Sequence, residues 1–341
     1  MKGLNILSLA FTIVGAFIGA GFVSGQELWQ FFGKFGKYGF SGLLVAVISI
    51  CFLSYTIIKN GIKNKAYSFE RIIAQKDMPF LKSALIVIET VFYFSIYVIM
   101  TAGAQSLLNQ SFMINKTLTG VIFVTFVTLI SVMGVKWIVS FFSATVPILT
   151  VSVLIVAVFS FSDAGVKIPA SESGSLLPAI FSAIVFVSYN FIAGIGVFAS
   201  LSRQLKSTKK LTWGSVIACF FLFILGTAIL ISIFTCQGAE LSDLPMITVA
   251  TKFNTVWGIV YAVLLIIAML GASLASLFPI AEMFKKSMAR KIICCTLISV
   301  LCVGLSSFGF KELISTVYPI FGYIGFIIIA LVLTNSFKKE Q

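Results

Sequence analysis

Apolar segments long enough to cross a lipid bilayer recur along the whole chain, and they restrict the fold more than any other feature. A membrane-spanning helix needs about 20 predominantly apolar residues. The sequence predicts ten such spans and leaves no connection long enough for a separate soluble domain. The spans lie at about 4–33, 40–58, 83–108, 117–134, 138–161, 175–201, 211–235, 256–283, 291–309 and 312–335. Residues 1–341 are therefore expected to form one all-α polytopic membrane domain.

Composition excludes several other classes of protein. Only 10% of the 341 residues are charged and 59% are hydrophobic, whereas a soluble domain is typically about 25% charged. A soluble enzyme, a disordered tail and a secreted disulfide scaffold are excluded on this ground. The chain contains no histidine, which removes histidine proton relays and histidine-ligated metals. The six cysteines show no CxxC spacing, and we interpret them as small apolar side chains.

The basic residues predict how the chain is oriented. With the N-terminus inside the cell, about three quarters of the 24 Lys and Arg residues fall in inner segments, as the positive-inside rule requires. Ten spans then place both termini in the cytoplasm. The net charge of +13 is thus an orientation signal for the lipid bilayer, and no nucleic-acid partner is expected. Two connections are expected to hold short helices, around Ser68–Ala74 and Pro245–Phe253.

The first apolar segment predicts a helix that is broken near the middle of the membrane. It is about 30 residues long, which exceeds one untilted crossing, and its middle carries Gly15, Gly19, Gly21 and Gly25. Ser24-Gly25-Gln26-Glu27 follows the capping-box pattern and predicts that a second half-helix begins there. Such a helix start attracts anionic groups. The expected substrate contacts in this segment are Gly19, Gly21, Ser24, Gly25 and Gln26. The alternative is close helix packing through GxxxG pairs.

The sixth segment predicts a matching break in a second half of the chain. Ser188, Tyr189 and Asn190 lie near its midpoint and are followed by Gly194. Interruptions at corresponding positions of two halves indicate a transporter binding site. We therefore expect a 5+5 inverted repeat, with one unit at about 4–161 and the other at about 175–335. These four residues are expected to contact substrate, and the alternative is hydrogen bonding between helices.

Three further groups are candidates for ion or substrate contact. Ser273 and Ser276 share one face of the eighth span, and with the carbonyls of Ala16 and Gly19 they are expected to supply oxygen ligands to a small hard cation. The alternative for the two serines is a packing seam of small residues. Glu89, on the third span, is a candidate for proton or ion coupling because buried acids in membranes are costly; a structural bond is the alternative. Tyr97 is expected to line the cavity, or else to pack as an ordinary aromatic residue.

The opening segment, Gly15-Ala-Phe-Ile-Gly-Ala-Gly-Phe-Val-Ser-Gly-Gln-Glu27 followed by Trp29-Gln-Phe-Phe32, resembles that of the YkvI-type bacterial membrane proteins. These are similar to the amino acid–polyamine–organocation superfamily. The resemblance implies the leucine-transporter fold, with spans one and six broken around the substrate and a sodium ion held between spans one and eight. The middle of span five, Ser143–Pro147, lacks the lysine of proton-coupled relatives. The Asp-Pro-Gly and Met-Pro-His motifs of metal-ion relatives are also missing, so no transition metal is expected.

The sequence as a whole predicts a secondary active transporter in the plasma (inner) membrane of a bacterium. Its partners would be a small organic solute such as an amino acid and a coupling cation, with sodium favoured over a proton. The movement would be alternating access. No cofactor is expected beyond a bound Na⁺, and no enzymatic activity. The alternative function is that of a ligand sensor: a transporter-fold subunit that binds a small molecule without moving it, as spore germinant receptor subunits are thought to do.

Overall fold

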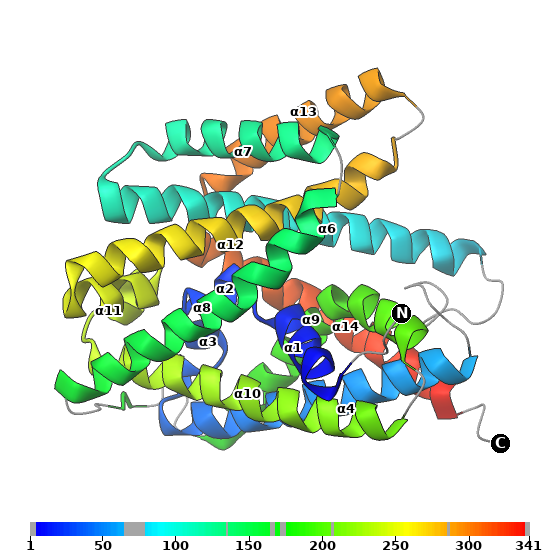
Figure 1. Ribbon diagram of the computed structural model, residues 1–341, viewed down its shortest axis with the longest axis horizontal. Helices are drawn as coiled ribbons and strands as arrows, with labels where there is room; N and C mark the ends of the chain where they lie inside the picture. Colours follow the sequence, from blue (N-terminus) through cyan, green and yellow to red (C-terminus); the bar gives the residue numbers. More distant parts are fainter. Residues whose placement is uncertain are drawn as a thin grey trace.

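The computed structural model is a bundle of helices (Figure 1). It describes residues 5–64, 79–133, 136–163, 168–170, 175–205, 208–284 and 287–337. Every regular element within these ranges is helical. The short helix expected around Ser68–Ala74 falls outside the described residues. The one expected at Pro245–Phe253 is confirmed as helix α11.

Seven helices of the described part are long and apolar enough to cross a membrane. They are α4 (Lys37–Asn64), α6 (Pro79–Phe112), α9 (Leu176–Gln204), α10 (Thr208–Thr235), α12 (Thr255–Glu282), α13 (Met288–Ser306) and α14 (Phe310–Phe337). Shorter apolar stretches occur in α1 (Ile6–Phe17), α7 (Lys116–Met133) and α8 (Lys136–Asp163). Each apolar segment of the sequence thus coincides with a helix, or with the start of a series of helices in the case of the first.

The helices are arranged in layers (Figure 1). Helices α7 and α13 pack on each other and on α6 and α12, whereas α4 and α10 form the opposite side of the bundle. Helices α1, α9 and α14 lie between these sides, and α8 crosses over α10 and α12. The first apolar segment is therefore enclosed by helices from both halves of the chain.

Close contact between α9 and α14 depends on glycine. A Cβ atom on Gly325 would overlap the Ser188 carbonyl, and one on Gly322 would overlap Val185 Cγ1. Between membrane helices there is no hydrophobic driving force comparable to that in water, so close packing at small residues supplies much of the attraction. These two glycines let the backbones approach and so fix the position of α9 against α14.

The predicted break in the sixth segment is wrong. Helix α9 runs from Leu176 to Gln204 without interruption. The polar side chains that suggested a break bond to their own helix: Ser188 Oγ donates to the Ile184 carbonyl (2.7 Å) and Asn190 Nδ2 to the Phe186 carbonyl (3.0 Å). Their hydrogen-bonding needs are met without opening the backbone ladder, so the helix continues through them.

Candidate functional site

The backbone of the first segment leaves the helical conformation at Ile18 and Gly19. Helix α1 ends at Phe17, and Gly19 is extended (φ −95°, ψ 177°) before the short helix α2 (Ala20–Val23) begins. The Gly19 N–H donates to the Phe17 carbonyl (3.1 Å), a bond that no α-helix contains. Carbonyls at the end of α1 and N–H groups at the start of α2 therefore lack helical partners.

Gly19 also lies beside open space. A Cβ atom at Gly19 would meet no heavy atom within 4 Å, and the residue is exposed although its neighbours Ile18 and Ala20 are buried. Backbone that is both accessible and freed from a helix can bind a ligand directly, which is the arrangement found where interrupted membrane helices line cavities.

The predicted capping box does not form. Helix α3 (Gln26–Phe31) begins after Gly25, which has a left-handed conformation (φ +82°) that favours glycine. Ser24 Oγ donates to the Gly21 carbonyl (2.7 Å) and accepts from the Gln26 N–H (3.3 Å). The Ser24 carbonyl accepts from the N–H of Met246 in α11 (3.0 Å). Gly25 is thus the N-cap of α3, and Ser24, one residue earlier, accepts from the first N–H of this helix.

Glu27 instead accepts a hydrogen bond from a tyrosine of α9. Its side chain is buried, with 5% of the residue exposed. Tyr189 Oη of α9 donates to Glu27 Oε2 (2.7 Å), and Tyr318 of α14 packs on Tyr189. The two tyrosine rings stack with centroids 4.4 Å apart. The same carboxylate explains Gly21, because a Cβ there would overlap Glu27 Oε1.

Gln26 is the second unusual side chain of α3. It has no exposed surface, and neither its Oε1 nor its Nε2 has a hydrogen-bond partner. Leaving a buried polar group unsatisfied costs about 1–3 kcal/mol. Two such atoms at one position are expensive, and they sit directly after the Gly25 turn. This amide therefore has hydrogen-bonding capacity that no described residue uses.

Of the remaining substrate candidates, Gly194 lies beside the interrupted segment and Tyr97 bonds to other helices. Gly194 lies against Phe198 and Phe17, so it adjoins the end of α1. The hydroxyl of Tyr97 lies 2.9 Å from Ser299 Oγ, which in turn lies 2.7 Å from Thr128 Oγ1. These partners lie on α13 and α7. No described hydrogen bond joins Tyr97 to the interrupted segment.

The ion candidates on α12 differ from each other. Ser276 Oγ donates to the Ala272 carbonyl (2.7 Å), whereas the fully buried Ser273 Oγ has no partner. Helix α12 reaches the first segment through Tyr261, whose Oη donates to the Val23 carbonyl (2.5 Å). Ser273 thus carries a buried oxygen that has no described hydrogen-bond partner. Among the described residues, the Ala16 carbonyl accepts no bond from outside α1, and the Gly19 carbonyl already accepts from the Val23 N–H (3.1 Å).

The acids are arranged differently from the sequence-based expectation. Glu89 is only half-buried and accepts a bond from Tyr93 of its own helix (2.9 Å). Glu27 is the more deeply buried acid; the sequence predicted it as part of a capping box, and Glu89 as the buried acid. The sequence does contain an indication of this role, because an acid that lies two residues after a glycine turn inside an apolar segment needs hydrogen-bond partners. Within the described residues, no three His, Cys, Asp or Glu side chains converge as a metal site would require.

Comparison with solved structures defines the class of fold. The protein is similar to MhsT in complex with L-phenylalanine (17% identity, 95% of this chain and 88% of that chain, TM-score 0.64). It is also similar to a mutant of the manganese transporter from Eremococcus coleocola (16% identity, 97% of this chain and 77% of that chain, TM-score 0.60). A third similar structure is the substrate-bound outward-open state of a Na⁺-coupled sialic acid symporter, with a TM-score of 0.57 and 12% identity. This match covers 97% of this chain and 78% of that chain. The fold is therefore that of the leucine-transporter class.

In sequence the protein is YkvI-like. It is 26% identical to the uncharacterized membrane protein YkvI of Bacillus subtilis (strain 168) over 98% of this chain and 96% of that one. It is equally similar, at 26%, to the uncharacterized protein YyaD of the same organism, over 96% of each. No model of a known protein family matches the sequence. The protein is thus an integral membrane protein with a transporter-like fold.

The overlap between Gly21 and Glu27 gives a stability prediction. Gly21→Ala should lower the melting temperature in detergent by about 2–4 °C or more, since a cost of 1 kcal/mol shifts a large domain by about this amount. In a Glu27→Ala background the same substitution should cost less, because the obstructing carboxylate is gone and the two sites are coupled. The control is Gly19→Ala, which meets open space and should leave the melting temperature nearly unchanged. An equal cost of Gly21→Ala in both backgrounds would contradict the proposed contact.

Proposed function

We propose that the protein is a secondary active transporter of a small organic solute, such as an amino acid, driven by a cation gradient. The observation that carries the proposal is the helix interruption at Gly19, which is accessible and lies inside a leucine-transporter-like fold. Alternating access would carry the solute past this interruption. Beyond this transport role, no enzymatic activity is proposed.

The helices support a topology for this function. The described residues contain seven long and three shorter apolar helices, which suit ten crossings with both termini in the cytoplasm. Two units of five, at about 4–161 and 175–335, would have opposite orientations because five is odd. The first segment and α9 would then occupy corresponding positions. Their contacts are direct: Tyr189 of α9 bonds to Glu27, and Gly194 adjoins Phe17.

Solute contacts are proposed for the interrupted segment itself. The freed backbone around Gly19 and Gly21 would bind the charged end of the solute, and the Gln26 amide would supply a donor and an acceptor. Ser24 and Gly25 shape the turn that presents this amide. Tyr189 would act by holding Glu27. Ser188 and Asn190 would have to exchange their bonds within α9 before contacting a solute.

A cation would bind between the first segment and α12. The unpartnered Ser273 hydroxyl and the lone pairs of Ser276 would join carbonyl oxygens at Ala16 and Gly19. Hard cations prefer such oxygen ligands, and sodium is favoured for this reason. For a proton, the coupling acid would be Glu27 rather than the half-buried Glu89, because Glu27 is closer to the interruption in sequence and more fully enclosed.

Uptake into proteoliposomes tests the function directly. With an inward sodium gradient, a panel of radiolabelled L-amino acids should show at least one solute that accumulates and that is released when the gradient is collapsed. A proton gradient alone should give little uptake, and uptake driven only by protons would assign coupling to an acid. Ligand-induced thermal stabilisation without flux under either gradient would contradict transport and indicate a receptor.

The buried amide of Gln26 gives a second prediction. Gln26→Met should raise the melting temperature of the ligand-free protein, because it replaces two unsatisfied polar atoms by an apolar chain of similar shape. It should also abolish stabilisation by the transported amino acid. The matched control is Thr119→Val, which removes another buried and unpartnered oxygen on α7. This control should also stabilise the protein but leave the ligand response intact. A retained ligand response in Gln26→Met would remove Gln26 from the site.

The cation site gives a third prediction. Ser273→Ala should raise the half-saturating sodium concentration for uptake about tenfold, which corresponds to about 1.4 kcal/mol of lost binding free energy. Ser131→Ala is the control, since Ser131 Oγ is likewise buried and unpartnered but lies on α7. Equal sodium dependence in the two variants would exclude Ser273 as a ligand.

A further inference from the structure

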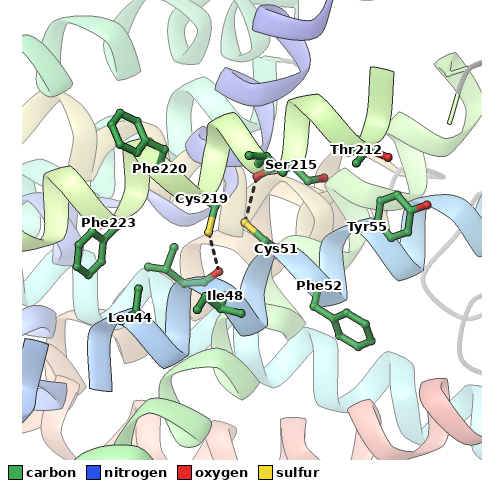
Figure 2. A pocket seen from close by; sticks show the side chains of 12 residues that line it. Leu44, Ile48, Cys51, Phe52, Tyr55, Thr212, Ser215, Cys219, Phe220 and Phe223 are labelled. Atoms are coloured by element: carbon green, nitrogen blue, oxygen red, sulfur yellow. Dashed lines mark hydrogen bonds between the residues drawn. The ribbon is translucent and has the colours of Figure 1, made fainter. Parts of the chain in front are cut away.

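A groove of about 490 Å³ runs along the outer face of the α4–α10 pair (Figure 2). Its walls are apolar: Leu44, Ile48 and Phe52 come from α4, and Val216, Phe220 and Phe223 from α10. Phe52 and Phe220 are 58% and 64% exposed, so the groove opens outward from the bundle. In an integral membrane protein this surface meets acyl chains, and a lipid chain fills such a groove better than water does.

One polar group inside the groove lacks a partner. Ser215 lines it, is only 4% exposed, and its Oγ makes no hydrogen bond. Other serines on these two helices bond back to their own backbone, as Ser54 does to Ile50 and Ser232 to Ala228 (both 2.7 Å). The Ser215 carbonyl is already used by the Cys51 thiol (3.1 Å) (Figure 2). The Ser215 hydroxyl therefore has a hydrogen-bonding capacity that no described residue uses, and a phospholipid carries ester carbonyls at the boundary of its acyl chains.

The same two helix faces become basic at one end of the groove. Lys59 follows the groove residue Tyr55 by one turn, and its Nζ lies 5.7 Å from the centroid of that ring. Lys209 precedes the groove residue Thr212 by one turn and is exposed. At 1.5 Å per residue, Lys209 lies about 9 Å along α10 from Ser215. This separation is similar to the thickness of one headgroup layer, about 5–8 Å.

We propose that the α4–α10 groove binds an anionic phospholipid. One acyl chain lies between the apolar walls, an ester carbonyl accepts from Ser215 Oγ, and Lys59 and Lys209 contact the headgroup phosphate. The positive-inside rule assigns this end to the cytoplasmic leaflet, where lysines next to membrane helices attract anionic headgroups. The site lies on the outer surface of the bundle and does not depend on the identity of any transported solute.

Native mass spectrometry of the full chain in a mild detergent tests the site. Dioleoyl phosphatidylglycerol and dioleoyl phosphatidylcholine share their acyl chains and differ in headgroup charge. The anionic lipid should form the first bound adduct at a concentration at least tenfold lower. Lys59→Gln combined with Lys209→Gln should remove most of this preference. Val216→Trp should fill the groove and weaken binding of both lipids. Glycerol 3-phosphate, which has the phosphate but no chains, should not compete.

Matched variants keep the test specific. Lys116→Gln combined with Arg290→Gln removes the same charge at exposed positions on α7 and α13, and it should retain the preference. Val263→Trp adds the same bulk on α12 and should leave binding unchanged. Melting temperatures identify any variant that unfolds, and Ser215→Ala then serves as the milder substitution, with weaker binding expected. Equal binding of the two lipids, or equal loss in the lysine variant and its control, would overturn the proposal.

Discussion

A peptide group inside a lipid bilayer must find its hydrogen-bond partner within the protein, and the architecture depends on this constraint. Helices meet this constraint along nearly all of the described chain, because each backbone N–H and carbonyl in a helix bonds within the same helix. The first segment is where the constraint is relaxed, at Ile18 and Gly19. Two glycines, Gly19 and Gly21, make this arrangement possible: the first faces open space and the second leaves room for the Glu27 carboxylate.

Buried polar side chains also need hydrogen-bond partners within the protein, and a few of them have none. Ser54, Ser188 and Ser276 each donate to the carbonyl four residues earlier, so their hydroxyls are satisfied within their own helix. Gln26 and Ser273 have no such solution. Gln26 carries two unsatisfied atoms and follows the interruption by one short helix and a turn. An unmet hydrogen-bonding capacity beside freed backbone is what a polar solute requires of a site that contains few charges.

Much of the fold could be predicted from the sequence, because the length of an apolar run is a local property. The first interruption was also readable, since excess length and clustered glycines both lie within one segment. The sixth segment misled because Ser188 and Asn190 are polar whether or not the helix opens, and only the structure shows that they bond to their own backbone. The Glu27–Tyr189 pair was out of reach, since its members are 162 residues apart and no periodicity connects them. Glu89, by contrast, could be identified as a candidate because the apolar residues around it are its neighbours in the sequence.

The contacts of the interrupted segment suggest how it would move in the proposed cycle. Helix α1 packs mainly on α10 and α9, whereas α2 and α3 also contact α12 and α14. The Ser24 carbonyl is bonded to α11, and the Val23 carbonyl to Tyr261 of α12. The two sides of the interruption therefore share α9 and α10, but the second side is also held by α12 and α14. A relative rotation of the two sides would be absorbed at Ile18 and Gly19, where few backbone hydrogen bonds resist it and no side chain at Gly19 obstructs it. The same feature that exposes backbone to a solute would thus also let α1 move independently of α2 and α3, which joins binding to movement at one point of the chain.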